Sequence, residues 1–263
     1  MKTYFYIAKL RMQTMLAYRV EIFTYMIMQC LMMVAIGFFW IAAYGDNEVS
    51  HNVTVDSMMT YNVIATLMNS MYYMGVEDRI ADSVKSGSIA TDMIKPVSLF
   101  GMYLAEDIGN LIICFFRSTI PLLAVGALIF GIPAPASPKH FVLFLSSFVL
   151  GYGINWTFSA IFAMISFTAI NLGPAFSVKY HFVNMLSGSI IPIWFFPQWL
   201  QTTVNCLPFV YMFQAPLSIY IGKYSINESL NALAIQAIWF VALTLLLIFA
   251  QRRATKRVLV QGG

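Results

Sequence analysis

Charged residues are scarce in this sequence, and their scarcity excludes an ordinary soluble domain. Only 10% of the 263 residues are Asp, Glu, Lys or Arg, whereas 60% are hydrophobic, and the mean hydropathy is +0.75. Soluble globular domains carry about 25% charged residues. The composition therefore predicts a membrane protein, and a net charge of +4 placed at membrane edges favours lipid headgroups over nucleic acid as the partner.

Cysteine is also rare, which argues against a disulfide framework or a thiolate metal site. The three cysteines, Cys30, Cys114 and Cys206, are far apart in the chain. Isolated cysteines of this kind are typical of small apolar packing residues.

The sequence lacks the common catalytic motifs. It contains no G-x-x-x-x-G-K-[ST] loop to hold ATP phosphates, no H-E-x-x-H and no G-x-S-x-G. We therefore expect no enzymatic activity, no cofactor and no metal site in this chain.

Long apolar runs dominate what is present. Each run is close to the roughly 20 residues that a helix needs to cross a bilayer. The pattern predicts an all-α polytopic membrane protein, a single transmembrane domain over residues 1–263, with six spans at about 22–44, 58–76, 108–131, 140–165, 176–195 and 230–250.

The positive charges alternate between the connecting segments. Placing the N-terminus in the cytoplasm puts only Lys139 and Lys223 outside, with Arg117 inside a span. The other twelve then lie in the cytoplasm: Lys2, Lys9, Arg11, Arg19, Arg79, Lys85, Lys95, Lys179, Arg252, Arg253, Lys256 and Arg257. Because cytoplasmic segments retain Lys and Arg, both termini are predicted to be cytoplasmic, and loop 45–57 with Glu48 external.

Two further segments flank the spans. Residues 2–20 have the pattern of an interfacial amphipathic helix, or of a cytoplasmic extension of the first span. Prolines and aromatic residues break the apolar run between spans five and six, and we expect external re-entrant helices there, marked by Pro192, Pro197, Trp199 and Pro208.

The cytoplasmic segment 77–100 carries a short amphipathic helix. Val76, Ile80 and Val84 recur every four residues, and Gly87 is well placed as the C-terminal cap. A second element ends before Pro96. The apolar stripe must be buried by a partner, by the protein's own helices or by the bilayer.

The residues of this segment resemble a sequence pattern of a known protein family. Gly87 and Ile89, followed by the run Met93 to Ser98, resemble the G-x-[IL] … [LM]-[LI]-[KR]-P-[VL]-S stretch of six-helix ABC-2-type permeases. The layout of spans and the basic tail agree over nearly the whole chain. The resemblance implies the membrane subunit of an ABC exporter of the bacterial plasma membrane, working as a dimer of identical or sister permeases.

The resemblance also implies a separate ATPase subunit that supplies ATP and Mg²⁺ chemistry. The segment matching 77–96 would be the coupling helix and its exit. The residues that we assign to this coupling site are Val76, Glu77, Ile80, Val84, Lys85, Gly87, Ile94, Lys95 and Pro96.

A substrate path is predicted from polar residues within the spans. Arg117 is a costly intramembrane charge, which either serves the path or snorkels toward the cytoplasm or backbone carbonyls. Asn155 and Asn184 are further candidates for the path, or contacts between helices. The apolar spans suit a hydrophobic or amphipathic substrate.

Two other functions remain open at this stage. An ion-coupled secondary transporter would need acidic residues deep in the spans, which this sequence lacks. A membrane-assembly subunit that transports nothing is the second alternative.

Overall fold

The computed structural model describes residues 2–17, 19–45, 49–72, 75–169 and 172–261. Side chains of residues 16–22 and 255–261 are not described, so the cations at 19, 256 and 257 and the expected external Glu48 lie outside the described part. The helices in chain order are α1 (Lys2–Ala17), α2 (Arg19–Tyr44), α3 (Val55–Met71), α4 (Val76–Lys85), α5 (Ile89–Ile94), α6 (Leu99–Cys114), α7 (Ile120–Phe130), α8 (Pro138–Ala163), α9 (Gly173–Leu186), α10 (Gln198–Asn205), α11 (Gln214–Tyr220) and α12 (Ile226–Gln261).

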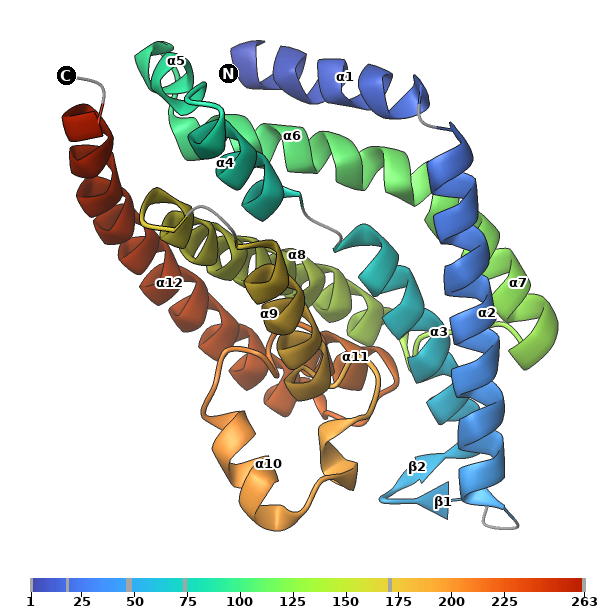
Figure 1. Cartoon of the computed structure of the whole chain (residues 1–263). Coiled ribbons are helices and arrows are strands. Elements are labelled where there is room, and N and C mark those ends of the chain that lie inside the picture. The colour runs from blue at the N-terminus through green and yellow to red at the C-terminus, as the bar shows by residue number, and fades with distance from the viewer. Residues whose placement is uncertain (1, 18, 46–48, 73–74, 170–171, 262–263) are drawn as a thin grey trace.

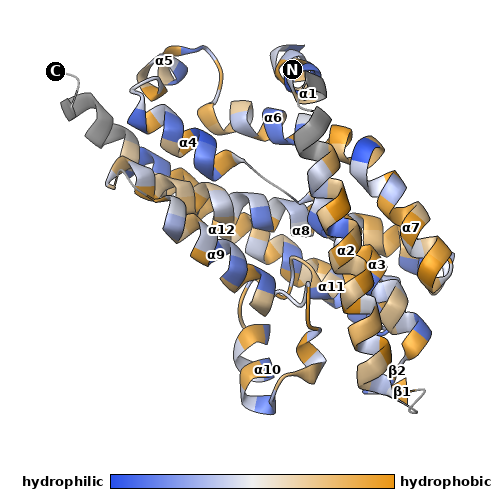
Figure 2. Cartoon of the chain, turned by 45° about the vertical axis from the view of Figure 1, so that its right-hand side comes forward, coloured by the Kyte–Doolittle hydropathy of each residue, from blue (hydrophilic) through white to orange (hydrophobic). Residues whose placement is uncertain are grey.

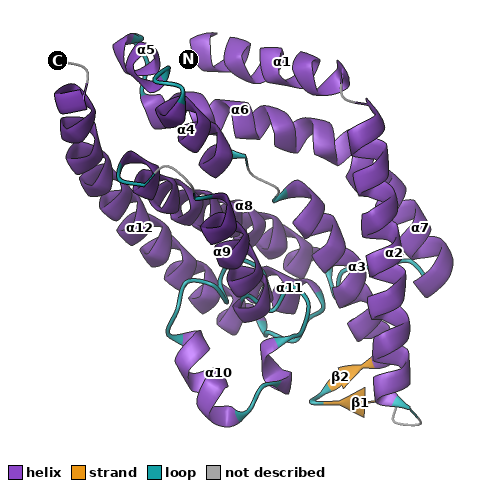
Figure 3. Cartoon of the chain, viewed as in Figure 1, coloured by secondary structure: helices purple, strands orange, loops and turns teal. Residues whose placement is uncertain are grey.

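The protein is nearly all helical, as the sequence predicts (Figure 3). The exception is a hairpin of β1 (Val49–Ser50) and β2 (Val53–Thr54) in the segment expected to be an external loop. His51 and Asn52 form its turn with positive φ angles of 51° and 61°. Two such residues in succession are typical of a type I′ turn.

Four described helical stretches are long and apolar enough to cross a membrane. They are Phe23–Tyr44, Leu99–Phe130, Pro138–Phe167 and Ile226–Ala254. The expected spans at 58–76 and 176–195 correspond to α3 and α9, which have 17 and 14 residues. At 1.5 Å per residue these helices are about 26 Å and 21 Å long, shorter than a bilayer core of about 30 Å. The helices in these two regions are therefore shorter than the predicted spans, and six membrane crossings stay a prediction.

The third apolar stretch is bent, and its limits differ from the predicted 108–131. α6 begins at Leu99 and lies beside α1, and a π-helical turn at Phe115–Thr119 then leads into α7. Pro121 explains the bend, because proline lacks an N–H and its ring displaces the carbonyl four residues earlier. A π turn widens the helix at this point and accommodates the ring.

α1 and α6 approach each other closely at a glycine. A Cβ atom on Gly109 would lie 2.5 Å from the Ala8 carbonyl oxygen, which leaves room for glycine alone. The residues of α1 that face α6 are half-buried, whereas Phe5 is 69% exposed. The expected helix at 2–20 thus forms as α1, but Phe5 lies outside its packed face.

The two ends of the molecule differ in content. Figure 1 shows the start of α1, the α4–α5 pair and the end of α12 at one end, and the hairpin and α10 at the other. Figure 2 shows α2 and α7 as largely hydrophobic and α4 as largely hydrophilic. The segments that carry most of the predicted cytoplasmic charge therefore share one end.

Buried amides hold the broken segment between α9 and α12. Gln214 accepts hydrogen bonds from Tyr61 Oη at 2.9 Å and from the Ile193 amide at 3.1 Å. Gln236 of α12 donates to the Tyr211 carbonyl at 2.8 Å. These bonds satisfy backbone groups that the helix breaks leave unpaired, and an unsatisfied group in an apolar surrounding is costly.

The prolines predicted to break this segment do so. Pro192 precedes a 3-10 turn at Ile193–Phe195, and Pro197 caps the N-terminus of α10. Pro208 is buried in the turns before α11, whereas Trp199 on α10 is 70% exposed. The segment is therefore a set of short helices, and its re-entrant position in a bilayer stays a prediction.

Candidate functional site

The α4 helix forms where the sequence predicts it, and its apolar stripe faces the protein's own helices. Val76 and Ile80 have no exposed surface, and α4 packs against α8 and the 3-10 turn that follows it. Val84 is half-buried. Of the possible partners for the stripe, the chain's own bundle covers these residues, so Val76 and Ile80 position α4 and do not present a surface to another subunit.

Glu77 ties the start of α4 to α9. Its carboxylate pairs with the Lys179 ammonium, and both side chains are about nine-tenths buried. The same ammonium donates to Ser159 Oγ of α8 at 2.9 Å. Burial raises the pKa of the Glu77 carboxyl, although the Lys179 ammonium opposes that rise. Protonation therefore opens this ion pair at a higher pH than an exposed glutamate would require.

Arg79 ties the same helix to α6. Its Nε lies 3.0 Å from Glu106 Oε2, and its Nη2 lies 2.9 Å from Asp107 Oδ1. Asp107 is 1% exposed and also accepts a 2.9 Å hydrogen bond from Trp156 Nε1 of α8. These ion pairs and the hydrogen bonds beside them, which we call the ionic cluster, connect α4 to α6, α8 and α9.

The outer face of the α4–α5 pair is exposed. Ile94 is 83% exposed, an unusual degree for an isoleucine, and Lys85, Gly87, Lys95 and Pro96 are exposed around it. Gly87 has a φ of +76°, as a left-handed C-terminal cap requires, so the predicted cap is confirmed. The predicted coupling residues thus divide into a buried set on α4 and an exposed set, which we call the tip of the α4–α5 pair: Lys85, Gly87, Ile94, Lys95 and Pro96.

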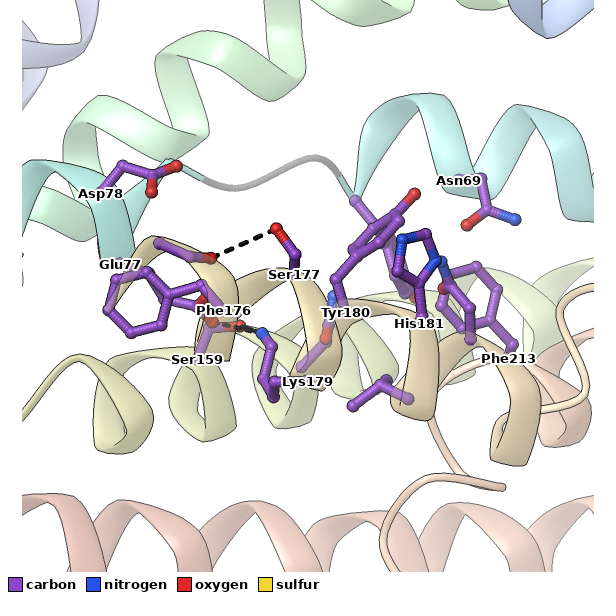
Figure 4. Close-up of a pocket in the computed structure, with 15 residues that line it drawn as sticks. Asn69, Glu77, Asp78, Ser159, Phe176, Ser177, Lys179, Tyr180, His181 and Phe213 are labelled. Carbon is purple, nitrogen blue, oxygen red and sulfur yellow. Dashed lines mark hydrogen bonds and ion pairs between the residues drawn. The ribbon is translucent and has the colours of Figure 1, made fainter. Parts of the chain in front are cut away.

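A cavity of about 290 Å³ lies beside the ion pair, between α3, α4, α8 and α9 (Figure 4). Its lining includes Glu77, Lys179, Asn155 and Asn184. The structure therefore brings two of the three predicted path residues together, next to α4.

A second cavity of about 220 Å³ lies along α2, α3 and α9. It shares Asn69, Tyr180 and Asn184 with the first cavity. The two cavities therefore adjoin along α9, and we call their polar lining residues the polar strip.

Arg117 does not line either cavity. It lies in the π-helical turn and donates from Nη1 to the Met15 carbonyl oxygen at 3.0 Å, near the C-terminal end of α1. A cation at this end of a helix is favoured by the helix dipole. Among the predicted alternatives for Arg117, contact with a backbone carbonyl is the one that the structure contains.

The sequence analysis missed several site residues. Lys179 was counted only as a cytoplasmic charge, and Arg79, Glu106 and Asp107 were not linked. The partners in these pairs lie 27 residues (Arg79 to Glu106) to 102 residues (Glu77 to Lys179) apart in sequence, and no local spacing identifies such pairs. Among the described residues, no group of three or more His, Cys, Asp or Glu side chains is arranged to hold a metal ion.

The fold and this cluster define a class: a helical membrane protein with an ionically anchored amphipathic helix at one end. The profile of the ABC-2 family transporter protein family matches residues 30–262, and the chain belongs to this family. It is therefore a multi-pass membrane protein of the ABC transporter permease type, a family whose members are generally non-catalytic membrane subunits that work with ABC ATPase subunits. Searches of curated proteins and of solved structures gave no match.

Proposed function

We propose that the chain is the permease subunit of an ABC exporter in a bacterial plasma membrane, with six spans over one domain and both termini in the cytoplasm. A separate ATPase subunit binds ATP and Mg²⁺ and drives it. The observation that carries the proposal is the α4–α5 pair, which is anchored by buried ion pairs and exposes Ile94 at its tip. An exposed apolar side chain on a rigidly held helix pair suits docking of a partner protein.

The ionic cluster provides the route by which motor movement reaches the spans. Glu77 connects α4 to α9 through Lys179, and Arg79 connects it to α6. Closure of two ATPase subunits would displace the α4–α5 pair, and the buried pairs would carry that displacement to both helices.

The polar strip along α9 is the proposed substrate path. Asn69 and Tyr180 line both cavities and are at least partly exposed, and polar groups that face lipid would be costly. A second permease copy, identical or a sister chain, would cover this strip and enclose the path. Its mixed polar and apolar lining suits a hydrophobic or amphipathic substrate.

Ion-coupled transport receives no support from the described acidic residues near α4 and α6. Glu77, Glu106 and Asp107 are all paired with cations at the α4 end. A carboxylate that exchanges protons or ions with the substrate path would have to leave such a partner.

The experiment is purification of the tagged full-length chain from its native membrane. We expect a protein with a G-x-x-x-x-G-K-[ST] motif to co-purify in a stoichiometric amount and to hydrolyse ATP. Purification of the folded chain without such a protein, under conditions that preserve membrane complexes, would contradict the proposal.

A further inference from the structure

A third cavity, of about 590 Å³, lies between α1 and the α4–α6 region, at the end of the molecule that holds the α4–α5 pair. It is separate from the strip along α9. Three cations, Arg11, Arg79 and Lys95, line it together with one acid, Glu106. The lining is therefore net positive, and an anion is the chemically fitting occupant.

The three cations are not equally committed to protein partners. Arg79 pairs with both Glu106 and Asp107, and Lys95 pairs with Asp92 at 2.6 Å outside the cavity lining. Arg11 donates from Nε to the neutral Asn110 Oδ1 at 3.0 Å. Among the described side chains, no carboxylate lies within ion-pair distance of Arg11, and Glu106, whose carboxylate the Arg11 charge stabilises at longer range, is already paired with Arg79.

Apolar groups line the remaining part of the cavity and continue outside it. Ile7, Leu10, Val97 and Met102 belong to the lining, and Leu10 is 65% exposed. On the same helix Phe5 is also largely exposed. An occupant with an anionic head and a hydrocarbon tail matches this combination, whereas a free phosphate ion would leave the apolar part uncovered.

We propose that this cavity binds one anionic phospholipid. Its phosphate lies between Arg11 and Lys95, and its acyl chains lie along Leu10 and the exposed face of α1. The site does not depend on a transport function, only on the membrane location. Bound lipid would join α1 to the junction between α5 and α6 and so stabilise the position of the α4–α5 pair.

The test is a binding titration of the purified full-length chain in a neutral detergent. Short-chain phosphatidylglycerol is the probe, native mass spectrometry counts bound lipid, and phosphatidylcholine and inorganic phosphate are run in parallel. We expect phosphatidylglycerol to bind in preference to both. Arg11→Gln and Lys95→Gln should each weaken its binding about tenfold, as expected for loss of one charge-assisted contact.

Lys9→Gln is the matched control, because Lys9 is exposed on the same helix and does not line the cavity. It removes the same charge and should leave binding unchanged. Equal weakening by Lys9→Gln would indicate nonspecific attraction and overturn the site. Displacement of phosphatidylglycerol by equimolar inorganic phosphate would overturn the lipid as occupant. If Arg11→Gln lowers the melting temperature, its weaker binding does not separate loss of the contact from loss of the fold, and the exposed Lys95→Gln variant then provides the test. Wild-type affinity of the Lys95→Gln variant for phosphatidylglycerol also overturns the proposal.

Discussion

At the scale of single residues, the Glu77–Lys179 pair is the clearest link between α4 and the spans. Both side chains are nearly buried, so removal of one partner leaves an unpaired charge at a cost of about 3 kcal/mol. We expect Glu77→Gln and Lys179→Met each to lower stability by that order. The double variant should lose much less than the sum. Unfolding of the purified chain in detergent measures this double-mutant cycle, and strictly additive losses would show that the pair is not coupled.

Arg117 is expected to act as an anchor for α1. Its hydrogen bond to the Met15 carbonyl oxygen holds the end of that helix, and a charge-assisted bond of this kind contributes about 1 kcal/mol when half-buried. Arg117→Leu should therefore speed amide hydrogen exchange in α1 by roughly fivefold. Lys9→Leu provides a control on the same helix. Unchanged exchange combined with altered export would instead assign Arg117 to the substrate path.

At the scale of elements, the two faces of the α4–α5 pair should respond differently to the same substitution. Ile80 is fully buried and Ile94 is 83% exposed. Ile80→Asp buries an unpaired carboxylate, so we expect low yield and a lower melting temperature. Ile94→Asp should fold normally and lose association with the ATPase.

Val49→Asp is the control for the second variant, because Val49 is 55% exposed on the hairpin at the opposite end (Figure 1). It should retain both stability and association. Normal ATPase binding by Ile94→Asp would remove the tip of the pair from the docking surface.

Local chemistry allowed much of this region to be predicted from the sequence. The four-residue repeat, the Gly87 cap and the stop at Pro96 each depend on neighbours within a few residues, and all three appear in the structure. The side to which the stripe turns does not follow from local sequence, because it depends on α8, which is about 70 residues further along the chain. The bend before Pro121 is absent from the predicted span 108–131, although the proline itself is the signal in the sequence for a bend there.

At the scale of the whole molecule, the grouping of segments into two ends predicts the topology. Lys85 ends α4, whereas Asn227 closely follows Lys223, whose ammonium donates to the His51 carbonyl of the hairpin at the other end. Both residues are exposed. With Cys30, Cys114 and Cys206 replaced, an impermeant thiol reagent applied to intact cells should label Asn227→Cys and not Lys85→Cys. Both sites should be labelled after the membrane is permeabilised. Labelling of Lys85→Cys from outside would reverse the orientation.

We propose that a separate ATPase docks on the exposed tip of the α4–α5 pair. A photoreactive amino acid placed at Ile94 in the tagged full-length chain tests it most directly, with the exposed Trp199 on α10 as the control position. After irradiation of intact cells, we predict a crosslinked adduct at Ile94 whose partner contains a G-x-x-x-x-G-K-[ST] motif, and no such adduct at Trp199. Adducts at Ile94 that contain no ATPase, or the same ATPase captured equally from Trp199, would contradict the account.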